Sequence, residues 1–185
     1  MSFQHSPRSS RRKPGSSADL VLGPGFRRGE RKENSGDQEI NPPTREKIVA
    51  LARSWIGTPY VHQASAKGAG ADCLGLVRGV WRELYGGEPE IPPPYTPDWN
   101  ERRGDEPLLA AARRNMTERK GGAPEPGDVV VFRIDPAGPA KHCGIVTVPA
   151  RFVHAYAGRH VCESWLYRWW RARLAGIFLF PGTDE

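Results

Sequence analysis

The spacing of apolar residues predicts helices in the first part of the chain. Apolar side chains recur every three or four residues after Thr44, a residue type that caps helix starts, and Gly57 marks the end of this first helix. The same spacing over residues 72–85 leaves more than half of the helix circumference apolar, so we expect this helix to be central and buried. A third helix is predicted from Pro107 to about Met116, with proline in its first turn.

After the glycine pair at 121–122 the spacing changes to two, which is typical of β-strands. Turn residues separate the apolar stretches, and residues 165–174 are predicted to form a short aromatic helix or bridge before the last strand. Helices first and an antiparallel sheet second make an α+β fold, with the N-terminal helices packed on a small antiparallel sheet. The expected strands cover residues 129–134, 142–148, 151–156, 160–163 and 177–180.

Composition divides the 185-residue chain into a tail and one domain. Residues 1–43 are rich in Pro, Gly and Ser and have no periodic apolar face, so we expect a disordered basic tail. A solvated linker or sequence upstream of the native start explains this tail better than a segment that contacts nucleic acid or an anionic surface. Residues 44–185 suffice for a single domain. The net charge of +6 is shared equally: the tail has 8 basic and 5 acidic residues, and the domain has 19 basic and 16 acidic residues. A positive charge spread in this way does not indicate that the protein binds nucleic acid.

No segment predicts a membrane span or an export signal. The apolar runs are far shorter than the roughly 20 residues that cross a bilayer, and residues 18–22, interrupted by Asp19, are too short for a signal peptide. We therefore expect synthesis in the cytoplasm without a signal peptide. The three cysteines, Cys73, Cys143 and Cys162, form no C-x-x-C pair, which disfavours a disulfide scaffold or a zinc site.

Cys73 is the candidate nucleophile. It stands at the first turn of the expected buried helix, directly after a loop rich in Gly and Ala and after Asp72. Free backbone N–H groups and the positive end of the helix dipole favour a thiolate at such a position and lower the pKa of the thiol. The alternative is that Cys73 is a small buried apolar residue, which is the commoner role of a single cysteine.

Two histidines on neighbouring strands supply the partners that such a thiol needs. His142 opens one strand and His154 lies in the next, so antiparallel pairing can bring the two imidazoles side by side. In this arrangement His142 takes the thiol proton as a general base, and His154 hydrogen-bonds its far nitrogen and fixes its tautomer. The alternative, a hydrogen-bonded strand residue without chemistry, fits each histidine alone better than it fits the three residues together.

Five sequence blocks follow one another along the domain: WIGTPY at 55–60, DCLGLV at 72–77, PGDVVVF at 126–132, HCGIV at 142–146 and FVHA at 152–155. In this order they closely resemble the NlpC/P60 cysteine peptidases, and the resemblance covers about residues 44–185. Residues 55–99 look most like the branch of this family that is encoded in the tail clusters of tailed phages and gene transfer agents.

The resemblance implies a papain-like fold and hydrolysis of peptide bonds in peptidoglycan stem peptides, typically between γ-D-glutamate and diaminopimelate. We expect no metal or other cofactor. It implies that Cys73 is the nucleophile, His142 the base and His154 the orienting third member. Tyr60 matches a tyrosine that lines the site and helps to hold the oxyanion. Asp72 matches an acidic residue before the nucleophile, and the role of helix N-cap is equally expected for it and compatible with that match.

The branch of the family implies a place of action and partners. The enzyme would travel on a virion or gene-transfer-agent tail, contact phage-like tail proteins and act on the cell wall in the periplasm. Leu74 stands where many members have serine, which leaves the bond that is cleaved open. Two alternatives also stay open: an amidase or acyltransferase on the same fold, and a structural tail-tip protein that has lost turnover.

Several other residues are expected to carry no chemistry. Cys143 directly follows His142 in its strand, and neighbouring strand residues point to opposite faces, so Cys143 should face the core. His160 and Cys162 share a face with His154, but their spacing matches no common zinc site. The aromatic residues expected to belong to the core and cover of the sheet, rather than to a sugar-stacking platform, are Trp165, Trp169 and Trp170.

Overall fold

The computed structural model describes residues 42–96 and 105–183. In it, side-chain caps fix the starts of the first two helices. Thr44 accepts a hydrogen bond from the backbone N–H of Lys47, and Asp72 accepts one from that of Gly75. Gly86, with a φ of 79°, ends the second helix in the left-handed conformation that glycine favours. The helices are α1 (Arg45–Ser54), α2 (Cys73–Tyr85), α3 (Pro107–Asn115) and α4 (Arg168–Arg171).

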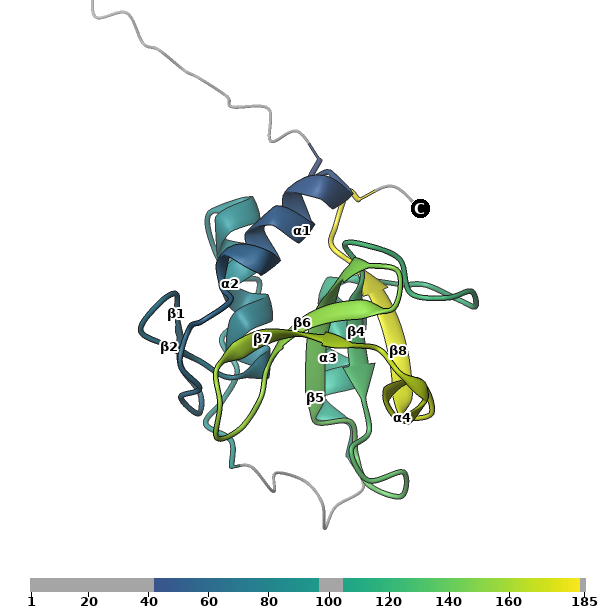
Figure 1. The fold of residues 1–185 in the computed structure, drawn as a ribbon. Helices are drawn as coiled ribbons and strands as arrows, with labels where there is room; N and C mark the ends of the chain where they lie inside the picture. The colour runs from purple at the N-terminus through teal and green to yellow at the C-terminus, as the bar shows by residue number, and fades with distance from the viewer. Residues whose placement is uncertain (1–41, 97–104, 184–185) are drawn as a thin grey trace, which may run out of the picture. The chain divides into compact units, whose positions relative to one another are not determined.

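The second half of the fold is a six-stranded antiparallel sheet in the order β3-β8-β4-β5-β6-β7 (Figure 1). A two-stranded hairpin, β1–β2, directly precedes α2. Helices and an antiparallel sheet in this order confirm the predicted α+β class. The strands are β1 (Ser65–Ala66), β2 (Gly70–Ala71), β3 (Thr117–Glu118), β4 (Val129–Phe132), β5 (His142–Val148), β6 (Arg151–Ala155), β7 (Val161–Trp165) and β8 (Leu174–Leu179).

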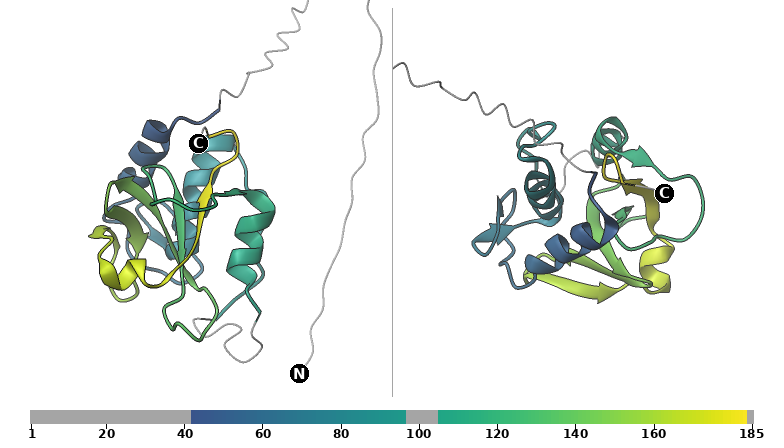
Figure 2. Two further views of the ribbon diagram at one scale, coloured as in Figure 1. Left: turned by 90° about the vertical axis from the view of Figure 1, so that its right-hand side faces the viewer. Right: turned by 90° about the horizontal axis from the view of Figure 1, so that it is seen from above.

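The two faces of the sheet bury different sets of side chains. Helices α1, α2 and α3 share the main core with one face, where Val131, Cys143 and Ile145 point towards them. Figure 2 shows α3 alongside the sheet in the turned view. On the opposite face, Phe132 and Phe152 belong to a smaller cluster that packs against the segment around α4. Alternate residues along each strand therefore serve the two layers, as strand geometry requires.

The starts of the first three predicted helices are confirmed to within one residue, and α1 ends at Ser54, before the predicted end at Gly57. Three short strands were not predicted. The hairpin β1–β2 falls in the region expected to be a polar loop, and β3 pairs with β8 at the sheet edge. Strands of two residues carry too little alternation to be recognised, and their partners are distant in sequence or lie across a glycine turn. The expected tail, apart from Pro42 and Pro43, lies outside the described residues, so the domain division stays a prediction.

The aromatic segment after β6 differs most from expectation. Strand β7 runs on to Trp165, and only four residues form α4 before β8 begins. Trp165 and Trp169 are 45% and 47% exposed and lie outside the core, so of the three tryptophans expected to form the core and cover of the sheet only Trp170 packs against the smaller cluster. Among the described residues, no helix has the length and apolar character needed to cross a bilayer.

Candidate active site

Cys73 is the first residue of α2, and short-range contacts hold this end of the helix. Asp72 Oδ1 accepts the N-cap hydrogen bond from the Gly75 N–H at 2.7 Å. The Asp72 N–H in turn donates to the Ala64 carbonyl oxygen at 3.2 Å, which docks the loop around β1 on the helix start. A Cβ on Gly75 would lie 1.8 Å from that same carbonyl oxygen, so glycine is needed for the close approach. Cys73 is thereby fixed at the positive end of the α2 dipole.

His142 and His154 contact each other on the face of the sheet opposite α2. Nε2 of His142 lies 2.8 Å from Nδ1 of His154, and the two rings are nearly perpendicular at 88°. Ile145 pairs with Val153, so the same register continued by one residue sets Gly144, rather than His142, opposite His154. A Cβ on Gly144 would come within 2.7 Å of the Phe152 ring and 3.0 Å of the His154 Cβ. Because Gly144 has no side chain, the imidazole of His142 can reach that of His154, its diagonal neighbour across the two strands.

Aromatic rings enclose the two imidazoles. Trp170 stacks on His142 with ring centroids 5.2 Å apart, and Phe152 stacks on His154 at 4.4 Å. Phe132 packs against Trp170 and completes the cluster. His142 is 9% exposed and His154 only 1%. This packing restricts the orientations of both rings and keeps water from the hydrogen bond between them.

The pKa of the Cys73 thiol lies well below its ordinary value. A hydrogen bond from the Cys143 side chain is the largest cause, burial opposes it, and the charge of His142 and a hydrogen bond to His142 lower the pKa further. Because Nε2 of His142 faces His154, Nδ1 is the ring nitrogen left for Cys73. The Cys73 Sγ also lies 3.9 Å from the Lys141 carbonyl oxygen. A lowered thiol pKa is what a cysteine nucleophile requires.

The neighbouring side chains Cys143 and His154 are uncharged. The hydrogen bond to Cys73, followed by burial, holds the pKa of Cys143 well above its ordinary value, so Cys143 donates to Cys73. Cys143 faces the core as predicted, but its contact with Cys73 was not predicted. Burial, helped by the charge of His142, lowers the pKa of His154 to about 3, so His154 is neutral at physiological pH.

The proline-rich segment after α2 reaches the site through Tyr95. Its hydroxyl donates to Asp72 Oδ2 at 2.5 Å, and its carbonyl oxygen lies 2.8 Å from Nε2 of His62 and 2.5 Å from Nε2 of Gln63. The Gln63 backbone N–H also donates to Asp72 Oδ2, at 2.7 Å. Asp72 is 2% exposed and fixes three segments of the chain; its pKa is raised, first by burial and then by the charge of Cys73.

A cleft of about 160 Å³ opens above Cys73. Tyr60 enters it because a bridge to Ala71 sets its segment beside the start of α2. Burial, and then the charges of Cys73 and Asp72, raise the pKa of Tyr60, so its hydroxyl stays protonated and can donate a hydrogen bond. The residues that line the cleft are Tyr60, His62, Asp72, Cys73, Tyr95, Thr96, Ile134, Lys141, His142, Ala155 and Ala157.

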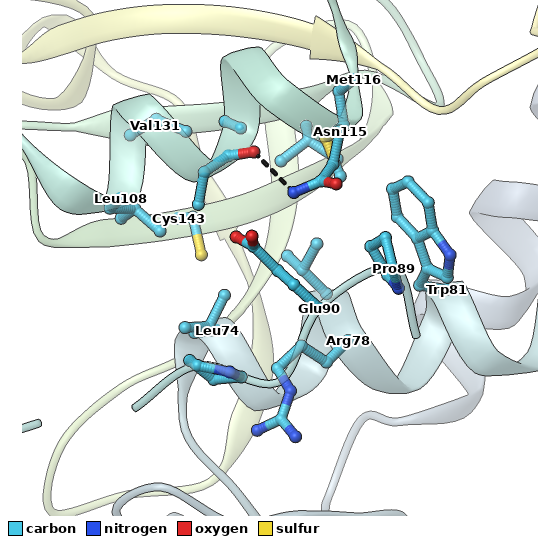
Figure 3. Close-up of a pocket in the computed structure, with 15 residues that line it drawn as sticks. Leu74, Arg78, Trp81, Pro89, Glu90, Leu108, Asn115, Met116, Val131 and Cys143 are labelled. Carbon is cyan, nitrogen blue, oxygen red and sulfur yellow. Dashed lines mark hydrogen bonds between the residues drawn. The ribbon is translucent and has the colours of Figure 1, made fainter. Parts of the chain in front are cut away.

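A second, apolar pocket of about 90 Å³ lies on the other side of Cys143, between α2, α3 and the segment that carries Glu90 (Figure 3). The Cys143 sulfur, Leu74 and Leu108 line it together with Trp81 and the Glu90 carboxylate (Figure 3). Cys143 thus contacts the nucleophile candidate in one direction and this pocket in the other. Within residues 42–96 and 105–183, no three His, Cys, Asp or Glu side chains gather as they would around a metal ion.

The structure brings all five residues singled out by sequence to one place. Tyr60, Asp72, Cys73 and His142 line the cleft, and His154 lies directly behind His142. Sequence reasoning missed Tyr95, the contact of Cys143 with Cys73 and the space created by Gly144. Of these three features, only the space beside Gly144 had a signal in the sequence, because an isolated glycine within a strand marks a close approach of two chain segments.

A thiol at a helix N-terminus, a histidine beside it and a buried second histidine in contact with the first form the arrangement that thiol-dependent acyl transfer of the papain type requires. Comparison with known proteins assigns the chain to a family. The NlpC/P60 family model matches residues 57–178, and the chain belongs to this family.

Known relatives agree with this assignment. The chain is 30% identical over 134 residues to gamma-DL-glutamyl hydrolase from Bacillus subtilis, a match that covers 72% of this chain and spans 29% of the length of that enzyme. The NlpC/p60 domain of the peptidoglycan hydrolase SagA superposes with a TM-score of 0.51 at 24% identity, covering 72% of this chain and 97% of that domain. An NlpC/P60 protein from Bacillus cereus gives 0.52 at 19% identity, over 75% of this chain and 40% of that one. These two solved structures support the fold.

Proposed function

We propose that the protein is a cysteine endopeptidase that cleaves peptide bonds in peptidoglycan stem peptides. The observation that carries the proposal is the Cys73 thiol of lowered pKa at the start of α2, beside His142 and its buried partner His154. The NlpC/P60 family consists of cell-wall hydrolases, which supports the substrate. The Bacillus subtilis relative, a gamma-DL-glutamyl hydrolase, supports a γ-glutamyl bond as the one cleaved. The proposal that diaminopimelate follows this bond rests on the resemblance to the family alone.

The reaction follows from the roles that the geometry allows. The Cys73 thiolate attacks the scissile carbonyl carbon, and the Tyr60 hydroxyl and the Cys73 backbone N–H stabilise the oxyanion. Protonated His142 gives its proton to the leaving amine as the C–N bond breaks, which leaves a thioester on Cys73. His142 then takes a proton from water, the hydroxide attacks the thioester, and cleavage of the C–S bond releases the acid and restores the thiolate.

Digestion of purified peptidoglycan tests this proposal. The parent protein and Cys162→Ala, which changes a free thiol outside the cleft, should release fragments at similar rates, and Cys73→Ala should release none above background. Equal release by the parent and Cys73→Ala would contradict the mechanism. No release by the parent, together with alkylation of Cys73 no faster than that of Cys143 and Cys162 near neutral pH, would favour the structural tail-tip alternative.

Mass spectrometry of the fragments separates the hydrolytic alternatives. An endopeptidase specific for the γ-D-glutamyl bond frees peptides that begin with diaminopimelate and leaves L-alanyl-D-glutamate on the glycan. An amidase would free intact stem peptides and leave bare glycan, and an acyltransferase would transfer an acyl group to an added acceptor instead of to water. Either of these results would keep Cys73 as nucleophile and change the substrate.

We further propose that a phage-like tail delivers the enzyme to the wall, so that it acts in the periplasm. The support is the resemblance of residues 55–99 to proteins of phage and gene-transfer-agent tail clusters. Peptide mass spectrometry of purified particles tests the proposal, with the periplasmic fraction of cells that lack particles as the comparison. Finding the protein in such cells at the same level, and not in particles, would contradict delivery by a tail.

A further inference from the structure

Both ring nitrogens of His154 have a close polar neighbour. Nδ1 lies 2.8 Å from Nε2 of His142, and Nε2 lies 2.9 Å from the hydroxyl oxygen of Ser164. Ser164 stands on β7, where it pairs with Phe152, and so projects on the same face of the sheet as His154. A continuous chain of polar contacts therefore runs from Cys73 through His142 and His154 to Ser164.

The direction of the protons in this chain follows from the chemistry at Cys73. His142 must present Nδ1 to the thiol, both to take its proton and, once protonated, to pair with the thiolate. Its Nε2 then carries a hydrogen in both states and donates to Nδ1 of His154, which must be unprotonated. Because His154 is neutral, with a pKa lowered to about 3, its single hydrogen sits on Nε2 and points at Ser164.

Ser164 is the better of two possible acceptors for that hydrogen. Its oxygen is 2.9 Å from Nε2 of His154, whereas the Cys162 sulfur lies 3.9 Å away and is a weaker acceptor. The two side chains are also 3.7 Å apart, so Cys162 can contact the serine hydroxyl without contacting the imidazole closely. Without an acceptor at 164, the Nε2 hydrogen of a 99% buried ring would lose its nearest partner.

We propose that Ser164 is a positioning residue that accepts the Nε2 hydrogen of His154 and thereby holds both histidines in the tautomers that the thiol needs. The role rests on the proposed function of Cys73 and His142. Ser164 does not contact the cleft. Its effect passes through His154 to His142, so it should change the reactivity of the thiol and not the binding of substrate.

Four proteins test this role: the parent, Ser164→Ala, Ser164→Thr and Cys162→Ala. The rate of iodoacetamide alkylation at Cys73, followed by peptide mass spectrometry, and kcat on a soluble stem peptide should both fall about tenfold in Ser164→Ala with KM unchanged. Ser164→Thr, which keeps a hydroxyl, should restore both rates to within about twofold. Cys162→Ala should match the parent. An unchanged alkylation rate in Ser164→Ala, or a loss in Cys162→Ala instead, would overturn the proposal.

A measurement on the parent protein keeps the proposal testable if Ser164→Ala does not fold. The ¹⁵N shifts of histidine-labelled protein distinguish a ring protonated at Nε2 from one protonated at Nδ1. We expect His154 to be the Nε2–H tautomer near neutral pH, and an Nδ1–H tautomer would refute the role of Ser164. Alkylation and NMR need no peptidoglycan, so an enzyme that fails to cleave the wall would refute the proposed function without deciding the role of Ser164.

Discussion

Different kinds of contact hold the two parts of the candidate active site. Cys73 lies on one face of the sheet, the pair His142–His154 lies on the other, and the two parts meet at the start of β5. Around Cys73 the contacts are hydrogen bonds within a short stretch of chain: the Asp72 cap and the approach of Ala64 to the helix start. Around the histidines they are aromatic ring contacts, and Trp170, which lies far from both in sequence, stacks on His142 and meets His154 edge-on.

This difference separates placement of the nucleophile from placement of its base. The cap of α2 forms from residues close in sequence and can orient Cys73 as soon as the helix forms. The histidine pair needs β5, β6, β7 and the α4 segment to be packed together before its geometry exists. Changes on the α2 side should therefore act as local losses of a hydrogen bond, and changes on the α4 side should disturb stability and chemistry together.

The largest expected effect is the acid sensitivity that His154 gives to the fold. Burial and the charge of His142 lower the pKa of His154 to about 3 in the folded state, whereas the unfolded chain takes up this proton near 6.5. Between these values the unfolded state binds more protons, so stability is full above pH 6.5 and falls as the pH is lowered towards 3. The shift corresponds to several kcal/mol, at about 1.4 kcal/mol per pKa unit.

Urea unfolding between pH 7 and pH 4 measures this effect. His154→Gln should be less stable than the parent at pH 7 but should lose less stability on acidification. His160 is exposed, so His160→Gln is the control for the substitution and should be as stable as the parent at pH 7. Equal slopes for the parent and His154→Gln would show that His154 does not titrate in the way its burial requires.

Gly144→Ala should produce the next largest effect. The added methyl would lie 2.7 Å from both the Phe152 ring and the Val153 carbonyl oxygen, so β5 or β6 must shift. We expect a loss of stability of about 1–3 kcal/mol and, because a displacement of about 1 Å in a catalytic group costs roughly a hundredfold, a fall in kcat of that order. Peptide hydrolysis and urea unfolding measure the two losses.

Gly138→Ala is the matched control for this change. A Cβ at Gly138 makes only ordinary contacts, the nearest at 3.4 Å, and the residue lies in the loop between β4 and β5. Its stability and activity should stay close to those of the parent. If Gly144→Ala also kept full activity, the histidine pair would not depend on the space beside Gly144.

The same difference explains which features the sequence could predict. The starts of α1 and α2 were predictable because capping residues and apolar spacing act over a few residues, and Cys73 followed from the start of α2. Antiparallel pairing also predicted that His142 and His154 would lie near each other. The diagonal contact beside Gly144, the stacking of Trp170 and the hydroxyl of Ser164 depend on strand register and on packing between distant segments, which one sequence does not encode in any local pattern. The contact of Tyr95 with Asp72 could not be predicted for the same reason.

A comparison of two helix caps gives a smaller effect. Asp72→Ala removes the cap of α2 and leaves the Gln63 N–H without its acceptor, so we expect a loss of stability of about 2 kcal/mol together with lower activity. Thr44→Ala removes the cap of α1, away from the cleft, and should cost about 1 kcal/mol with activity unchanged. Full activity in Asp72→Ala would show that the position of Cys73 does not depend on its cap.

The smallest effect is expected for Tyr95→Phe, which removes one hydroxyl and leaves the Tyr95 carbonyl contacts in place. That hydroxyl donates to Asp72 Oδ2 and opposes the rise in the pKa of this carboxyl that burial causes. Its loss should raise the pKa of Asp72 further and cost about 1 kcal/mol where the carboxyl is ionised, but less at acidic pH where it is protonated. Unfolding at pH 7 and pH 4 measures the difference from the parent.

Tyr85→Phe is the control for this change. The Tyr85 hydroxyl donates to the Pro181 carbonyl, a group that does not titrate, so any loss of stability in this variant should be the same at both pH values. A loss in Tyr95→Phe that is equally independent of pH would mean that the tyrosine supports the fold without acting on the charge of Asp72.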